Sequence, residues 1–160
     1  MKFFVDASYI NQEKLGSWAV ISDQFQRSGV ICGNLNSGYC ELYATFQGIL
    51  EASRYDNAVI YTDSNYVYSN LNWKAQQYER KDWTSKSWRK RIPNKNLLRK
   101  TFELYRQNPQ IKVKEINRKQ NKEADKLAKR TLKKVKGENR NGGIAKSEIW
   151  RGVGGIREIL

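Results

Sequence analysis

The sequence has no histidine, and only two of its 160 residues are cysteines. The absence of histidine excludes a Ser-His-Asp triad, a histidine-ligated zinc and a haem held by histidine. Cys32 and Cys40 are too few for a four-thiolate zinc site, and their spacing is not CxxC. So few thiols favour a reducing compartment, and we therefore expect a cytoplasmic protein.

Long apolar segments are also missing. No apolar run approaches the ~18 residues that a membrane-spanning helix needs, so we expect no membrane association. The apolar stretch at the N-terminus is short and is interrupted by Asp6, which is unlike a signal peptide.

Acidic residues are scarce relative to basic ones. The chain has 16 Asp and Glu against 30 Lys and Arg, which gives a net charge of +14. Hydrophobic residues make up 39% of the chain, enough for the core of one domain. The excess positive charge indicates a polyanionic partner, and nucleic acid is the leading candidate. A membrane surface is the weaker alternative, because it requires a basic helix with a strong apolar face.

The hydropathy pattern predicts one α/β domain with elements in the order βββαβαβα. Apolar runs predict strands over 2–7, 17–22, 27–32, 58–63 and 111–116, and the first three form an antiparallel meander. Helical spacing predicts helices over 39–53, 64–71, 97–105 and 124–135. Helices alternate with strands in the second half, which implies helices packed on a mixed sheet. Residues 73–95 form a basic, Trp-rich insert, and residues 137–160 form a Gly-rich basic tail.

Four acids stand where the predicted elements can bring them together. Asp6 and Asp63 end predicted strands. Glu41 and Asp125 lie in the first turns of predicted helices, and ligands of open α/β sheets gather where strand ends meet helix starts. Two carboxylates ~4 Å apart repel by about 4 kcal/mol at an effective dielectric near 20, and a divalent cation offsets that cost. Each acid alone also fits a structural role, in a helix dipole or in a turn.

Four short motifs surround these acids: FVDAS at 4–8, ELYA at 41–44, IYTDSNYV at 60–67 and NKEADKLA at 121–128. In this order and spacing they resemble the motifs of the ribonuclease H type 1 family over roughly residues 2–135. Ala7 stands where the family usually has glycine. Any one motif is weak evidence, whereas four in register, each with its acid, are strong evidence.

The resemblance implies a ribonuclease H-like fold, with a five-stranded mixed sheet flanked by helices, over residues 1–136. The insert at about 73–95 resembles the basic handle of some family members. The implied activity is endonucleolytic hydrolysis of the RNA strand of RNA–DNA hybrids, leaving 3′-hydroxyl and 5′-phosphate ends. The implied catalytic residues, which are also ligands of two Mg²⁺ or Mn²⁺ ions, are Asp6, Glu41, Asp63 and Asp125. We expect a monomer.

The loop before the last predicted helix departs from the family pattern. Family members commonly have a histidine there that assists proton transfer or product release, whereas this loop offers Arg118. An arginine cannot lose its proton at working pH, so it cannot shuttle one. We therefore expect Arg118 to bind phosphate or help the product leave.

The insert carries most of the expected substrate contacts. Residues 74–100 hold ten basic residues and two acidic ones, a net charge of +8. Lys and Arg neutralise phosphates, while indole rings pack against sugars or bases. We expect Trp83 to contact DNA and Trp73 to anchor the insert to the body. The nucleic-acid-binding residues that we predict are Ser8, Asn36, Ser37, Gly38, Asn65, Lys81, Trp83, Lys86, Arg89, Lys90, Arg91, Asn94, Lys95 and Arg118.

Three alternatives remain open from the sequence. The same scaffold could cut another nucleic acid, such as double-stranded RNA or a DNA junction. The chain could also be a catalytically silent module that binds nucleic acid. A second basic cluster, over residues 126–136, has the default interpretation of a solvated helix face and the alternative of an extended phosphate track.

Overall fold

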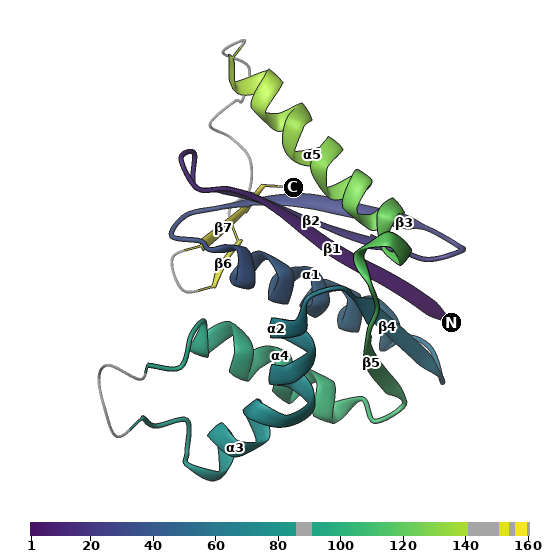
Figure 1. Cartoon of the computed structure of the whole chain (residues 1–160), viewed down its shortest axis with the longest axis vertical. Coiled ribbons are helices and arrows are strands. Elements are labelled where there is room, and N and C mark those ends of the chain that lie inside the picture. Colours follow the sequence, from purple (N-terminus) through teal and green to yellow (C-terminus); the bar gives the residue numbers. More distant parts are fainter. Residues whose placement is uncertain (86–90, 141–150, 154–155, 160) are drawn as a thin grey trace.

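A mixed β-sheet forms the centre of the computed structural model, which describes residues 1–85, 91–140, 151–153 and 156–159 (Figure 1). The first three strands are an antiparallel meander: β1 (Lys2–Ile10), β2 (Leu15–Ile21) and β3 (Gln26–Cys32). Strand β4 (Ala58–Thr62) pairs parallel with β1, and β5 (Ile111–Glu115) pairs parallel with β4. The order β5-β4-β1-β2-β3 confirms the predicted five-stranded sheet.

The C-terminal tail adds two strands to this sheet. Strand β7 (Ile156–Ile159) pairs antiparallel with β3, and β6 (Arg151–Val153) pairs with β7. The sequence pattern predicted neither strand, because glycines interrupt the short apolar segments of the tail. The predicted start of the tail after residue 136 also falls inside the last helix, α5 (Lys122–Arg140).

Helices cover both faces of the sheet. Helix α1 (Ser37–Ala52) and helix α4 (Lys95–Gln107) lie on one face, and α5 lies on the other (Figure 1). The segment after β4 is helical from Asn65 to Arg80: α2 (Asn65–Ser69), the π-helix η1 (Asn70–Lys74) and α3 (Ala75–Arg80) follow one another directly. The first part of the predicted insert, up to Arg80, is therefore helical, although its sequence has only weak helical periodicity. The short 3₁₀-helix η3 (Arg118–Gln120) precedes α5.

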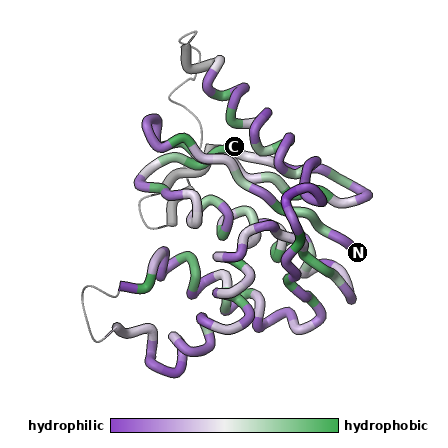
Figure 2. Tube along the Cα trace, in the orientation of Figure 1, coloured by the Kyte–Doolittle hydropathy of each residue, from purple (hydrophilic) through white to green (hydrophobic). Residues whose placement is uncertain are grey.

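Close packing of both layers sets the positions of the acids. Gly48 lets α1 approach β1, since a Cβ there would lie 2.7 Å from Cγ1 of Val5. On the opposite face the Ser17 hydroxyl donates to the carbonyl of Ala128 at 2.6 Å and so fixes α5 against β2. Figure 2 shows apolar residues along the central strands and an alternation of apolar and polar residues along α5.

Two boundaries differ from the sequence prediction near the acids. Strand β1 continues to Ile10, where a turn-rich stretch was predicted, so the prediction that Asp6 ends the strand is wrong: Asp6 lies within β1 and pairs with Ala19. Helix α1 begins two residues earlier than predicted, because Asn36 is its N-cap and accepts from the Tyr39 N–H at 2.8 Å. Among the described residues, no helix is both long enough and apolar enough to cross a membrane.

Candidate active site

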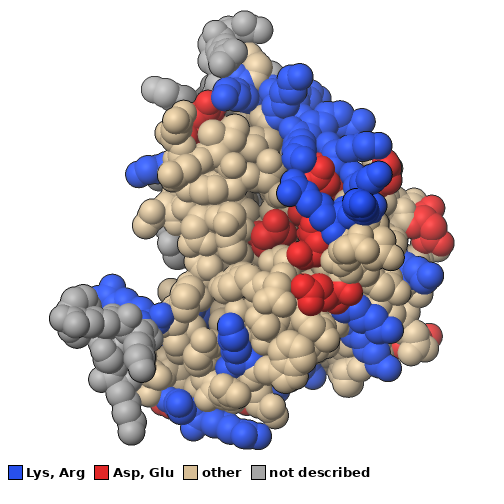
Figure 3. All heavy atoms as spheres, viewed as in Figure 1, with Lys and Arg blue, Asp and Glu red and all other residues tan. Residues whose placement is uncertain are grey.

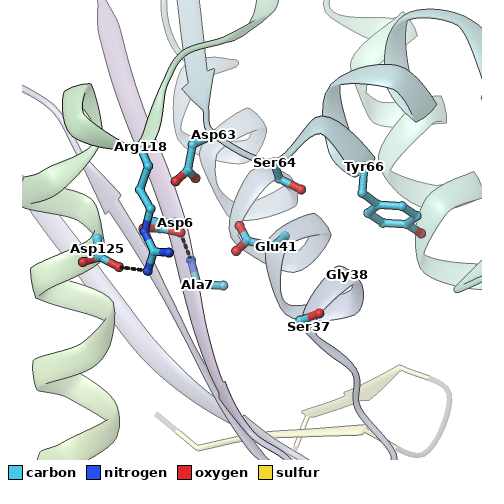
Figure 4. A pocket seen from close by; sticks show the side chains of 10 residues that line it. All are labelled: Asp6, Ala7, Ser37, Gly38, Glu41, Asp63, Ser64, Tyr66, Arg118 and Asp125. Atoms are coloured by element: carbon cyan, nitrogen blue, oxygen red, sulfur yellow. Dashed lines mark hydrogen bonds and ion pairs between the residues drawn. The ribbon is translucent and has the colours of Figure 1, made fainter.

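Three acids from separate segments meet beside the carboxyl end of β4. Asp6 lies on β1, Asp63 directly follows β4, and these two strands run parallel side by side. Glu41 projects toward them from α1 (Figure 4). One carboxylate oxygen from each of the three acids lies within 4.8 Å of the others. The sequence therefore identified the members of this cluster, although Glu41 lies in the second turn of α1 and not in the first.

Asp125 borders the same cleft, but its carboxylate pairs with two basic side chains. It lies in the first turn of α5, as predicted. The Lys129 ammonium lies 2.7 Å from its Oδ2. The Arg118 guanidinium lies 3.6 Å from its Oδ1, a contact drawn in Figure 4. Asp125 is therefore neutralised by side chains, whereas the other three acids face one another.

Burial and mutual repulsion make ionisation of the cluster costly. Burial, followed by the charges of Asp6 and Asp63, raises the pKa of Glu41 to about 9. Burial, followed by the charge of Asp63, raises the pKa of Asp6 to about 7. A hydrogen bond from the Ala7 N–H to Asp6 Oδ1, 2.8 Å long, and the positive charge of Arg118 act in the opposite direction on Asp6. Ionising these acids together therefore costs free energy, and a bound cation would offset that cost.

The donor set fits a hard divalent cation. Glu41 Oε2 is buried and has no hydrogen-bond partner, so it has an oxygen available as a ligand. Carboxylate oxygens are the ligands that Mg²⁺ prefers, and Mg²⁺ sites in proteins use few of them and keep several waters. Three oxygens within 4.8 Å meet this requirement.

Asn121 joins the strands to α5 and was not among the predicted site residues. Its buried side-chain amide donates to the Val5 carbonyl at 2.8 Å and to Asp63 Oδ1 at 3.3 Å. This amide holds the start of α5 beside β1 and also orients the Asp63 carboxylate. The signal that could have identified it is its place at the start of the NKEADKLA motif.

The cleft around the acids has a volume of about 310 Å³. Three predicted substrate contacts line it, namely Ser37, Gly38 and Arg118. Tyr66 also lines it and was not predicted. Beside Tyr66, the Asn36 amide donates to Asn94 Oδ1 at 2.9 Å, and the Asn94 amide donates to the Tyr66 hydroxyl at 3.0 Å. The structure therefore brings Asn36 and Asn94 together, from the starts of α1 and α4.

The other predicted contacts lie outside the cleft lining. Ser8 is two residues beyond Asp6 and so points to the same face of β1. The amide of Asn65 lies 3.4 Å from a Glu115 carboxylate oxygen. Of the predicted basic contacts in the insert, Lys81, Arg91 and Lys95 are exposed. Lys86, Arg89 and Lys90 lie outside the described residues.

The roles predicted for two tryptophans are wrong. Trp83 is only 3% exposed and packs against Tyr78 and Phe102, so its ring is not available for contact with DNA. Trp73 is 52% exposed and meets the ring of Tyr68 edge-on, so it is not a buried anchor. The reversal arises because the turn after α3 places the Trp83 ring against Phe102 of α4, a tertiary contact that local composition does not show.

Comparisons with solved structures identify the same fold. A foamy viral protease–reverse transcriptase in complex with dsDNA matches with a TM-score of 0.70 and 19% identity, over 84% of this chain and 94% of that chain. The foamy viral enzyme in complex with an RNA/DNA hybrid matches with a TM-score of 0.72 and 17% identity, over 84% of this chain and 20% of that longer chain. The RNase H domain of PFV, solved in solution, matches with a TM-score of 0.65 and 17% identity, over 82% of this chain and 93% of that chain.

A search of curated proteins found no match. The model of the RNase H family matches residues 1–133, a span that contains β1 to β5 and all four predicted acids. The three-acid cluster and the order of the first five strands agree with this match. The chain therefore belongs to the RNase H family.

Proposed function

We propose that this protein is an endoribonuclease that hydrolyses the RNA strand of RNA–DNA hybrids and leaves 3′-hydroxyl and 5′-phosphate ends. Membership of the RNase H family makes it a nuclease. The observation that carries the finer proposal is the meeting of Asp6, Glu41 and Asp63 in one cleft. One of the similar foamy viral structures is a complex with an RNA/DNA hybrid, which supports this choice of substrate.

In this proposal the acids hold two divalent ions, Mg²⁺ or Mn²⁺. Asp6, Glu41 and Asp63 would supply ligand oxygens to these ions. Asp125 would be the fourth ligand residue, with an ion in place of its present contact with Lys129. Bound ions of this kind generate hydroxide and stabilise the leaving oxygen. Such chemistry requires no histidine, in agreement with the composition of the chain.

The residues around the acids orient the substrate. Ser37 and Gly38 share a cleft wall with Glu41, where a ribose 2′-hydroxyl can be distinguished from deoxyribose. The Asn36 amide donates one hydrogen to Asn94 Oδ1 and has a second to offer a phosphate beside the cleft, while Asn94 holds Asn36 in place. The exposed Lys81, Arg91 and Lys95, together with Lys86, Arg89 and Lys90, neutralise the DNA strand in this proposal. We propose that the protein acts as a cytoplasmic monomer.

A substrate panel tests this function. The purified chain is incubated with RNA–DNA hybrid, double-stranded RNA, a DNA junction, double-stranded DNA and single-stranded RNA, each with Mg²⁺, with Mn²⁺ and with chelator. Cleavage of the hybrid alone, in its RNA strand and only with metal, is the expected result. Cleavage of another substrate in preference to the hybrid would identify a same-fold nuclease of different specificity, and binding without cleavage would identify a silent module.

Replacing Arg118 with alanine is expected to slow hybrid cleavage by about 10-fold, far less than loss of an acid of the cluster. The guanidinium lies at the cleft and contacts Asp125 at 3.6 Å, but it cannot carry a proton. Steady-state kinetics are the measurement, with Arg118→Lys as the matched variant that keeps the charge. A loss in Arg118→Ala as large as that in Asp63→Asn would contradict this ranking.

A further inference from the structure

We propose that the exposed face of α5 binds the phosphate backbone of the nucleic acid beyond the cleft. The α5 basic face consists of Lys126, Lys129, Arg130, Lys133, Lys134 and Lys136. The identification of the nucleic acid as a hybrid rests on the proposed function, but the contact itself is a separate claim about this helix.

The composition of the face is one-sided. From residue 126 to residue 136 the helix has six basic residues and no acidic one. Of the apolar residues of this stretch, Leu127, Ala128 and Leu132 are buried against the sheet, and Val135 is partly buried. Every charged side chain of the stretch is thus directed away from the core, on a face about 15 Å long at 1.5 Å per residue. That length matches about four base pairs of a duplex at 3.4 Å each.

Half of these cations lack an ion partner among the described side chains. Lys126, Lys129 and Lys136 pair with Glu123, Asp125 and Glu13. No described carboxylate pairs with Arg130, Lys133 or Lys134. Arg130 and Lys134 are also four residues apart on one helix, where like charges repel and destabilise the helix slightly. An anion on this face would remove that repulsion.

A groove beside these two cations offers hydroxyl groups. It lies between α5 and β3, has a volume of about 460 Å³, and is lined by Arg130, Lys134, Thr131 and Ser28 among others. The Thr131 hydroxyl oxygen lies 2.8 Å from that of Ser28. Cations combined with hydroxyls are the groups that proteins direct at phosphate oxygens of a nucleic acid.

The α5 basic face continues from the acidic cluster. Its helix begins with Asp125 at the cleft, and Figure 3 shows a band of Lys and Arg that runs from the acidic residues along α5. Other basic residues lie on the opposite side of the acids (Figure 3). A polyanion held over the cleft would therefore meet positive charge on both sides. Nucleic acid fits better than a membrane surface, because the apolar residues of this stretch pack on the sheet and none of them is fully exposed to insert into lipid.

The test compares two double variants with the same loss of charge. Arg130→Gln with Lys134→Gln removes two unpaired cations of the α5 basic face. Lys2→Gln with Lys112→Gln is the control, because both residues are exposed and lie at the starts of β1 and β5, whereas Asp6 lies in the middle of β1 and Asp63 follows the end of β4. Fluorescence anisotropy in chelator measures the affinity for a labelled hybrid of about 20 base pairs at several salt concentrations.

We expect the α5 variant to bind about 3- to 10-fold more weakly at low salt. Its slope of log affinity against log salt should fall by about 1 to 2, since each lost phosphate contact removes about 0.9. The control should keep a slope close to that of the wild type. Equal slopes for the α5 variant and the control would overturn the proposal. Circular dichroism and the melting temperature establish that both variants fold, and Arg130→Glu with Lys134→Glu should enlarge the effect.

Cleavage by the wild-type chain separates this proposal from the proposed function. If the wild type binds hybrid through the α5 basic face but cuts no substrate with any metal, the proposed function fails and the contact stands. If the wild type cuts hybrid while the slope of the α5 variant is unchanged, the contact fails and the proposed function stands.

Discussion

Replacing Asp63 with asparagine is expected to reduce hybrid cleavage by at least about 10³-fold. Such a loss corresponds to about 4 kcal/mol of transition-state stabilisation at 1.36 kcal/mol per tenfold. The amide keeps the size of the side chain, and its oxygen can still accept from Asn121, which lies 3.3 Å from Asp63 Oδ1. The substitution removes the negative charge that binding of the proposed ions requires. Single-turnover kinetics with saturating Mg²⁺ are the measurement.

Two controls accompany this variant. Its melting temperature in chelator should equal or exceed that of the wild type, because one of the mutually repelling charges is gone. Glu103→Gln changes an exposed acid that pairs with Arg99 on the surface of α4, and it should leave cleavage unchanged. Full activity of Asp63→Asn would remove the basis of the proposed function.

Replacing Glu41 with glutamine is expected to stabilise the metal-free protein at neutral and alkaline pH. The folded protein raises the pKa of Glu41 from 4.5 to about 9, so folding favours the protonated form. The free energy of unfolding of the wild type therefore falls, relative to the variant, as pH rises from about 4.5 to about 9. At pH 7 the variant should be more stable by about 1–3 kcal/mol, since one pKa unit corresponds to 1.36 kcal/mol.

Urea unfolding of both proteins in chelator, at pH 4.5, 7 and 9, measures this difference. The two stabilities should be similar at pH 4.5 and should diverge at the higher values. Mg²⁺ or Mn²⁺ should then stabilise the wild type more than the variant, because a ligand that binds only the folded state raises its stability. A difference that does not depend on pH would mean that folding does not raise the pKa of Glu41. Glu103→Gln is again the matched control.

The sequence predicted most strands and helices of the domain and identified its acids. Apolar runs and helical spacing are local signals, and they located the five strands and the four main helices of the domain. Asp6, Glu41 and Asp63 were recognised because each stands in a short motif whose order along the chain is itself informative. The cleft then confirmed that these three residues meet.

Local signals failed where a contact joins distant segments. Trp83 and Trp73 occupy a region of similar composition, yet only the packing of α3 against α4 decides which ring is buried. The role of Asn121 also depends on distance in three dimensions, because its amide reaches both Val5 and Asp63. Strands β6 and β7 form by pairing with β3, and their short, Gly-interrupted sequences carry little strand signal of their own.

The sequence by itself thus determined which residue types this protein has for its chemistry: a quartet of acids, a large excess of cations and no histidine. Only the tertiary structure decided that three of those acids form a cluster, while the fourth, at the same cleft, is neutralised by Lys129 and Arg118. The physical reason is that the pKa of a carboxyl group depends on burial and on the charges within a few ångströms of it. Those neighbours come from β1, α1, β4 and α5, and they become neighbours only when the sheet and its helices pack together.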